Sequence, residues 1–416
     1  YVLRPLAMVC LRNPYLAAPI ILFPYQKGGN YRRWYGNNEY VINYQFAGKE
    51  LMEAEGAATI PENYAFREAI TYSRVTSGPT GFRLQNDSCL FDSAAVNIFV
   101  ADVQYLLGLL NSKIVRKYLS VFSPGMNTQP GDIAKIPVLR SCDNEENVRK
   151  LVSCNLKISR ADWDSFETSW DFQRHPLVTP AIDQQYLRLA DCWRDWERAC
   201  NERFAQLKAN EEELNRIFID IYGLQDELTP EVDDKDVTVR KADLGRDIRS
   251  LISYAVGCML GRYSLDKPGL AFAGGSWSDY LSNGYELKAK SYRPDKDGIL
   301  PITDDEYFYD DIVTMFVDWV KMVYGAATLE ENLTFIANAL SANSLQLKAK
   351  SSREVIRAYF LNDFYADHLK TYQKRPIYWL FSSGKKRIKS RIIRLIYICH
   401  KIRIKPFKPI FFFKVI

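Results

Sequence analysis

The feature that most restricts the fold of this chain is a long apolar stripe between about Ala181 and Tyr222. Its members recur at three- and four-residue spacings: Trp193, Trp196, Cys200, Phe204, Leu207, Leu214, Ile217, Phe218 and Ile221. That period matches one face of an α-helix, so the segment predicts either one long amphipathic helix or two helices in a hairpin. The acidic run 211–213 lies off the stripe and is expected to face solvent.

The first third of the chain mixes strand, turn and helix signals. Residues 69–84 are rich in β-branched and aromatic residues around a Ser77-Gly78-Pro79 break, which predicts a pair of strands. Residues 23–44 predict a loop, a turn and a strand. Residues 105–121 carry a helical stripe, and residues 127–138 predict a polar loop followed by a short apolar strand.

Beyond the long stripe, residues 229–240 predict a linker, and residues 247–259 and 310–324 again show helical periodicity. The stretch between these two helices, 261–303, is rich in Gly, Ser, Asp and Pro. At 416 residues the chain can bury two or three cores. We therefore expect an α+β chain with a mixed α/β domain over 23–140, a helical spacer over 141–240 and a mainly helical domain over 241–384.

The two ends differ in composition from the rest. Residues 1–22 are apolar but interrupted by Arg4, Arg12 and prolines, which fits neither a signal peptide nor a membrane helix, so the segment is expected to be atypical and foreign to the domain after it. Residues 385–416 contain eleven Lys and Arg but no Asp or Glu. This composition is explained either by a basic tail at a membrane surface or by translation out of frame. The abrupt change of composition and the helix-breaking Pro406 and Pro409 favour translation out of frame.

The net charge of +5 is an effect of that tail, because residues 1–384 hold 44 basic against 50 acidic side chains. Residues 23–139 carry 11 basic and 10 acidic groups, whereas residues 140–240 carry 14 and 22. A nucleic-acid contact needs a basic face for the phosphates, so it is expected in the first of these segments.

Two clusters in residues 23–139 have the residue types for DNA contact. The first places cationic and stacking groups beside Gly28, Gly29 and Gly36, and it consists of Lys27, Arg32, Arg33 and Trp34. The second surrounds the Gly78-Pro79 turn and includes Arg67, Arg74, Thr76, Ser77 and Arg83. Arg pairs with guanine, and Asn or Gln with adenine, so Arg74, Arg83, Gln85 and Asn127 are candidates for reading base edges. By residue type alone, a solvated loop surface explains both clusters better than DNA contact does.

Long strings in this region resemble a known family. FPYQKGGNYRRWYGNNEYVINY, YAFREAITYSRVTSGPTGFRL, FDSAAVNIF and YLLGLLNSKIVRKYLSVFSPGMNTQPGDIAKIPV occur in the order found in the C-terminal half of the BREX-system adenine-specific DNA methyltransferases, the PglX family. Residues 251–272, 298–313 and 374–385 extend the resemblance to about Lys385. The LLGLLNSK helix and the closing Ile-Pro-Val are also similar to specificity subunits of type I systems, and the region to type IIG and IIL proteins.

The resemblance implies a parent reaction in which a methyl group passes from S-adenosylmethionine to adenine N6 in a short asymmetric DNA site, marking host DNA against phage. Within such an enzyme this chain would choose the site. Double-stranded DNA is the expected partner, together with a methyltransferase domain or other BREX proteins, in the cytoplasm and without a membrane. The alternatives left open are a protein-interaction scaffold and an inactive gene fragment.

The catalytic motifs of that family are missing from the sequence. A flipped adenine is held by an Asn-Pro-Pro-Tyr-type loop, for which the chain offers only Asn13-Pro14-Tyr15, and no Gly-x-Gly occurs for the cofactor. Asp279, Glu286 and Lys288 have the residue types of a nuclease centre, but a surface loop explains them better. Eight cysteines without a CxxC pair and three histidines predict reduced thiols and no zinc site. We expect no catalytic residue and no cofactor in this chain.

Overall fold

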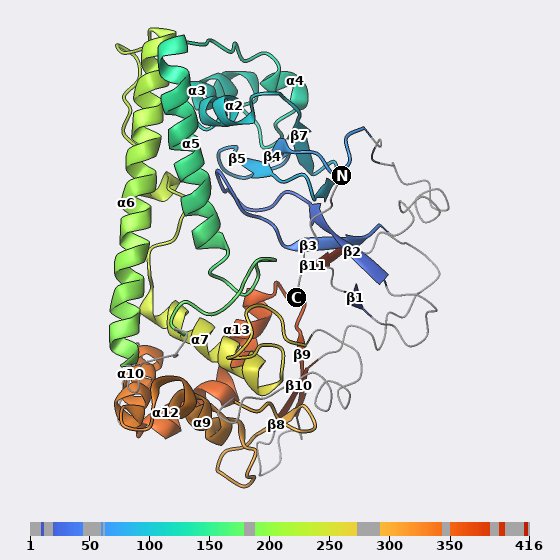
Figure 1. The fold of residues 1–416 in the computed structure, drawn as a ribbon, viewed down its shortest axis with the longest axis vertical. Coiled ribbons are helices and arrows are strands. Elements are labelled where there is room, and N and C mark those ends of the chain that lie inside the picture. The colour runs from blue at the N-terminus through green and yellow to red at the C-terminus, as the bar shows by residue number, and fades with distance from the viewer. Residues whose placement is uncertain are drawn as a thin grey trace.

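The computed structural model describes residues 10–11, 20–44, 60, 63–178, 188–272, 292–342, 350–382, 391–395 and 412–414. These form an upper and a lower lobe, both packed against one long helix at the edge of the molecule (Figure 1). Helices and small β-sheets both contribute, so the predicted α+β class is confirmed. Asn13-Pro14-Tyr15, the Asp279/Glu286/Lys288 group and the tail residues outside 391–395 and 412–414 fall outside the described residues.

The long stripe forms one helix rather than a hairpin. Helix α6 spans Leu189–Tyr222 and ends at Gly223, whose φ of 65° is the left-handed conformation that closes many helices. Helix α5 (Cys142–Trp163) packs alongside it. Because α6 passes from the upper lobe to the lower lobe, its stripe contributes to the cores of both (Figure 1).

The upper lobe contains a three-stranded antiparallel sheet of order β5-β4-β7, made by β4 (Ala69–Ser73), β5 (Phe82–Gln85) and β7 (Ala95–Ile98). This confirms the strand pair predicted around the Ser77 break. Its apolar face packs on α2 (Val103–Leu110), which is followed by α3 (Lys113–Phe122). The single helical stripe of the sequence is thus broken in two at Asn111, whose side-chain amide hydrogen-bonds both backbone groups of Phe82.

A second sheet joins β1 (Cys10–Leu11), β2 (Ile20–Gln26), β3 (Tyr40–Asn43) and β11 (Phe412–Lys414), with β6 (Leu90–Phe91) parallel to β2. The segment from Phe23 therefore starts as a strand and not as the predicted loop, because β2 has β3 and β6 as neighbours. The strand expected near the end of 127–138 is also wrong. Residues 134–138 form a turn and irregular chain, and helix α4 (Pro130–Ile133) forms just before them, begun by Pro130 and by a reciprocal cap between Gln129 and Asp132.

The lower lobe is mainly helical, as predicted. It holds α7 (Leu244–Met259), α9 (Ile312–Tyr324), α10 (Leu329–Ser341), α12 (Ser352–Asn362) and α13 (Phe364–Thr371). A small sheet of order β8-β10-β9 closes it, from β8 (Ile299–Ile302), β9 (Tyr378–Ser382) and β10 (Arg391–Leu395). Two strands, β10 and β11, therefore come from the basic and apolar tail.

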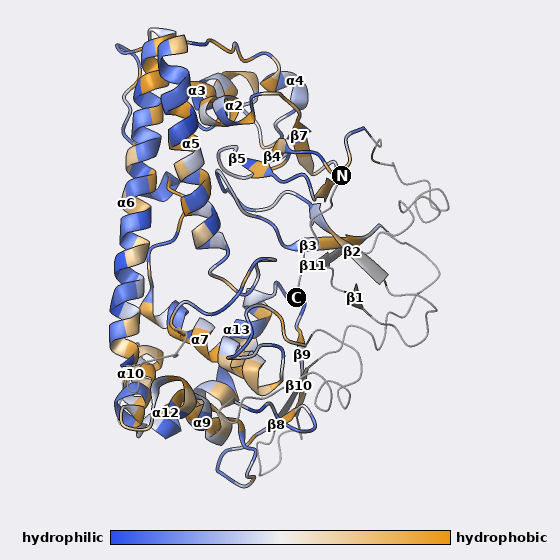
Figure 2. Cartoon of the chain, viewed as in Figure 1, coloured by the Kyte–Doolittle hydropathy of each residue, from blue (hydrophilic) through white to orange (hydrophobic). Residues whose placement is uncertain are grey.

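Each lobe has its own large apolar core. The upper core runs from Trp34 through the β5-β4-β7 sheet to Phe204, Phe218 and Val239, and the lower core centres on α7 and α9. Figure 2 shows apolar residues gathered on α2, α7 and α9, while α6 carries polar residues along much of its length. The predicted linker 229–240 contributes Val232, Val237 and Val239 to the upper core and contains a short 3₁₀ turn, η2 (Asp234–Asp236). It therefore packs against the upper lobe along its length.

Candidate functional site

The first predicted cluster forms a turn that lies inside the molecule. We call residues 27–38 the inner turn. Trp34 runs beside β5, with backbone hydrogen bonds to Phe82 and Leu84, and is 1% exposed. Gly28 and Gly36 have φ of 75° and 132°. A Cβ at Gly28 would lie 2.8 Å from the carbonyl oxygen of Ala94, and one at Gly36 2.6 Å from the Arg32 Nε. Glycine at these two positions thus lets the backbone of the inner turn pack directly against Ala94 and Arg32.

Arg33 and Trp34 both bind one carboxylate on α6. The Arg33 guanidinium donates to Glu211 Oε2 at 2.6 Å, and the Trp34 indole donates to Glu211 Oε1 at 2.6 Å. Arg33 also donates to the backbone oxygens of Asn111 and Asp236. Burial lowers the pKa of Arg33, but the negative charges of Glu211, Tyr31 and Asp236 together outweigh this effect and raise it. The expectation that 211–213 face solvent is therefore wrong for Glu211, which is buried.

Arg32 makes a second buried ion pair, with Asp162 at the end of α5. The same carboxylate accepts from the backbone N–H of Arg240 at 3.1 Å. Burial would raise the pKa of Asp162, but the positive charges of Arg240 and Arg32 lower it. These ion pairs fasten the inner turn to three separate segments of chain, so Arg32, Arg33 and Trp34 are corrected from DNA contacts to structural residues in this conformation.

Arg83 and Gln85 are also buried, each 1% exposed, on the polar face of the β5-β4-β7 sheet. Gln85 accepts a hydrogen bond from Asn97 and donates one to the backbone oxygen of Arg67. Burial, aided by the charge of Arg32, lowers the pKa of Arg83 to about 10. A base edge cannot reach either side chain in this conformation, because the inner turn covers that face of the sheet. Their assignment to base reading is corrected for the same reason.

Apart from Lys27 and Arg67, the remaining predicted residues lie together at the surface; Arg67 precedes β4, and its side chain contacts the ring of Phe99. Residues 74–76 pair with 126–128 through the Val75–Asn127 bridge and through hydrogen bonds from Thr76 N to Met126 O and from Thr128 N to Arg74 O, both 2.9 Å. We call residues 74–80 and 123–129 the outer ribbon. Ser77 and Asn127 are exposed, whereas Arg74 and Thr76 are half-buried. Arg74 donates to Gln129 at 3.0 Å.

Lys27 lies elsewhere, half-buried and 6.0 Å from the ring centre of Tyr40 in β3. Burial lowers its pKa, and the charge of Asp92 opposes that effect. It is therefore not part of the outer ribbon.

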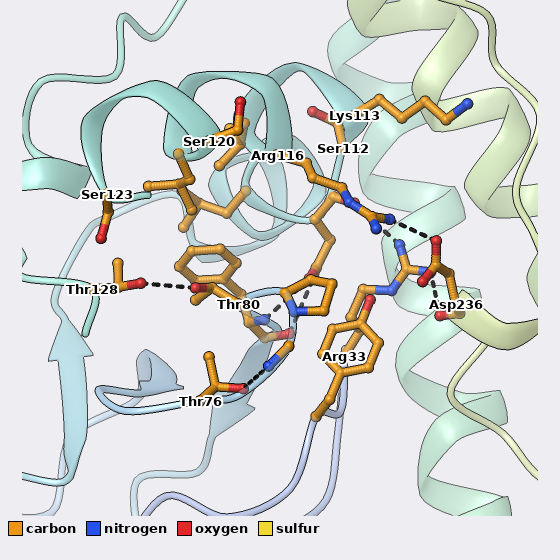
Figure 3. Close-up of a pocket in the computed structure, with 18 of the residues that line it drawn as sticks. Arg33, Thr76, Thr80, Ser112, Lys113, Arg116, Ser120, Ser123, Thr128 and Asp236 are labelled. Carbon is orange, nitrogen blue, oxygen red and sulfur yellow. Dashed lines mark hydrogen bonds and ion pairs between the residues drawn. The ribbon is translucent and has the colours of Figure 1, made fainter. Parts of the chain in front are cut away.

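A cavity of about 320 Å³ separates the outer ribbon from α3. Its floor is apolar and includes Phe82, Leu110, Val115 and Leu119. Hydroxyl groups line its sides: Thr76, Thr80, Ser120, Ser123 and Thr128 (Figure 3). At one end, Arg116 forms an ion pair of 2.6 Å with Asp236, while Lys113 extends away from the cavity. This mixture of an apolar floor with a few hydrogen-bonding groups is typical of sites for small organic groups.

Sequence reasoning missed the residues that complete this surface. Arg116 and Lys117 on α3 and Lys135 after α4 are exposed cations close in sequence to the cavity wall. For Arg116 and Lys117, the signal was the polar side of the helical stripe in 105–121. Asp236 carried no such signal, because it reaches the cavity only through the packing of the segment 229–240.

A metal site is marked by a cluster of ligand side chains, and a site for S-adenosylmethionine by a Gly-rich turn. No group of three or more His, Cys, Asp and Glu side chains among them could hold a metal ion. The sequence has no Gly-x-Gly turn for S-adenosylmethionine, so the residues present do not fit that cofactor. Within the described part of the chain, no single helix is long and apolar enough to cross a membrane; α9 and α10 meet that measure only as a pair, bent by 118°.

Two curated proteins are similar to most of this chain. It is 43% identical over 377 residues to "Adenine-specific methyltransferase PglX" of Lacticaseibacillus casei (strain Zhang), a match that covers 87% of this chain and 30% of that protein. It is 34% identical over 389 residues to "Adenine-specific methyltransferase BrxX" of Escherichia coli O9:H4 (strain HS), covering 88% of this chain and 31% of that protein. No family model matches the chain. The resemblance to these methyltransferases is confirmed, and the chain spans about a third of the length of the relatives it matches.

Proposed function

We propose that this chain chooses the DNA site for an adenine-specific DNA methyltransferase of a BREX phage-defence system. The observation that carries the proposal is the similarity of 87–88% of the chain to two proteins named as adenine-specific methyltransferases. In the parent enzyme, S-adenosylmethionine supplies the methyl group for adenine N6 in duplex DNA. This chain has no motif for that cofactor, so its own share is recognition.

The outer ribbon and the start of α3 are the surface best suited to meet DNA. Ser77 and Asn127 can exchange hydrogen bonds with base edges, and Arg74 lies between them and α4. Arg116, whose side chain is 51% exposed, and the exposed Lys117 supply positive charge for phosphates on the adjoining helix. The inner turn serves this surface indirectly, because it holds β5 and α6 together beneath it.

Selection from a pool of random duplexes tests the proposal with the 416-residue chain itself. We expect it to retain duplexes that share one short asymmetric sequence. In fluorescence anisotropy, the logarithm of the affinity should fall linearly with the logarithm of the salt concentration. Lys117→Gln should lower that slope by about one unit while leaving the selected sequence unchanged. Lys370→Gln, a change of the same charge on α13 of the lower lobe, should leave the slope unaltered.

A chain that retains no sequence above the background of the pool, and that shows no salt-dependent binding, would refute the assignment.

A second candidate function is a protein-interaction scaffold, which exposed aromatic residues of the lower lobe favour. Tyr309 is 87% exposed between β8 and α9, and Trp379 and Phe381 on β9 are about half exposed. This alternative predicts stable capture of another defence protein without sequence-selective DNA binding. The duplex selection separates the two candidates directly, because only DNA recognition enriches a sequence.

A further inference from the structure

Contacts with DNA phosphates need only an exposed basic surface, yet the structure also has a cavity with an apolar floor beside the outer ribbon. We infer that this cavity receives one nucleotide unstacked from the duplex at the recognition site, while Met126 fills the gap left in the base stack. This inference rests on the proposed function and names a contact within it. The nucleotide is a second one, distinct from the adenine that an N6-methyltransferase extracts for reaction.

The first support is the lining of the cavity. An unstacked base is bound by apolar contact on its faces and by hydrogen bonds at its edges. Leu119, Pro79 and Pro124 offer apolar contact, and the sides offer the hydroxyls of Thr76 and Ser120. The volume of about 320 Å³ is at the lower end of the range for sites that enclose small ligands.

The second support is the ion pair at one end. Asp236 binds Arg116 through Oδ2 at 2.6 Å, and its carboxylate also lines the cavity. A carboxylate accepts from an exocyclic amino group such as cytosine N4, and a guanidinium donates to ring nitrogens and carbonyls. The pair therefore favours a base that carries an amino group over thymine.

The third support is the exposed apolar side chain of Met126 on the ribbon. Met126 is 60% exposed and lies opposite Thr76, which lines the cavity, so the two side chains are on the same face of the ribbon. Apolar side chains that insert between base steps compensate for lost stacking in many proteins that kink DNA. Nothing lies within 4 Å of a Cβ built at Gly78 or Gly125, so the mouth of the cavity is open on the ribbon side.

The test uses the selected duplex with 2-aminopurine placed at one position after another. This base fluoresces more strongly when it is unstacked. We expect binding of the chain to raise the fluorescence several-fold at one position outside the methylated adenine, and hardly at all elsewhere. Met126→Ser should weaken binding to the selected duplex about tenfold, a loss of about 1.4 kcal/mol.

A cavity-filling variant locates the unstacked base. Ser120→Phe adds a ring at an exposed position of α3 that lines the cavity, and it should abolish the fluorescence rise while leaving phosphate binding in place. Ser120→Ala removes only the hydroxyl and should keep the rise. Melting temperatures close to that of the unaltered chain would show that both variants keep the fold.

Selective binding with no fluorescence rise at any position would overturn the inference and leave the proposed function standing. A rise that survives Ser120→Phe would overturn it as well, because the unstacked base would lie elsewhere. Loss of all sequence-selective binding by the unaltered chain would overturn both.

Discussion

The inner turn and the outer ribbon have similar compositions, yet the fold uses them in opposite ways. Both combine glycines, arginines and hydroxyl or amide side chains. Residues 32–38 of the inner turn are buried, and its arginines are paired with Glu211 and Asp162. The outer ribbon is open on one side, and Ser77 and Asn127 are exposed. Residue types suited to DNA phosphates are equally suited to carboxylates of the same protein, so location decides between the two uses.

The largest expected loss of stability is for a substitution of Glu211, the carboxylate that binds the inner turn. Glu211→Ala leaves Arg33 buried without its counter-charge and removes the acceptor of Trp34, so the free energy of unfolding should fall by about 3–5 kcal/mol. Glu213→Ala, two residues along α6, breaks a partly exposed pair with Arg216 and should cost at most about 1 kcal/mol. Urea unfolding of both variants measures the difference, and equal losses would contradict the structural role of the inner turn.

Asp162 provides a pH-dependent form of the same test. Its pKa is lowered in the folded state, so the stability it contributes is present at neutral pH and is lost as the pH falls below the ordinary Asp value of about 4. Asp162→Asn should lower the free energy of unfolding by about 3 kcal/mol at pH 7, and the gap to the unaltered chain should narrow in acid. Asp226→Asn, at an exposed site, is the matched control. A gap that stays constant down to pH 3 would exclude this ion pair as its source.

A pair of glycine substitutions compares the backbones of the two regions directly. Gly36→Ala forces a side chain onto a residue with φ of 132° and a contact of 2.6 Å with Arg32, so it should cost about 1–3 kcal/mol. Gly78→Ala meets nothing within 4 Å and should change stability by less than about 0.5 kcal/mol. Thermal unfolding distinguishes them, and similar melting temperatures would mean that the inner turn tolerates rearrangement.

The smallest effect on stability is expected at the outer ribbon, where the effect on DNA selectivity should be largest. Asn127→Ala and Ser77→Ala should each change the free energy of unfolding by less than about 0.5 kcal/mol, because both side chains are exposed. If either reads a base edge, its loss should relax selectivity at one position of the selected sequence by about 1–3 kcal/mol. Ser93→Ala, at an exposed turn before β7, should leave the sequence unchanged. A selection result unaffected by both ribbon variants would remove these side chains from the recognition surface.

Sequence periodicity predicted much of the fold because apolar spacing reflects which side of an element is buried. The stripe ending at Tyr222 became α6, and the break at Ser77 became the connection between β4 and β5. It failed where a neighbour distant in sequence decided the outcome. Asn111 ends α2 because its amide binds the backbone of Phe82, and Phe23 lies in a strand because β3 and β6 pair with it.

The candidate site likewise depended partly on local sequence and partly on contacts between residues far apart in the chain. The sequence by itself determined the resemblance to adenine-specific methyltransferases and the presence of basic, glycine-containing turns in residues 23–139. Only the tertiary structure decided which turn faces solvent, because Glu211 and Asp162 lie more than a hundred residues from the arginines they bind. A charged side chain is costly to bury without a partner, and whether a partner exists depends on the packing of distant helices, which local sequence does not contain.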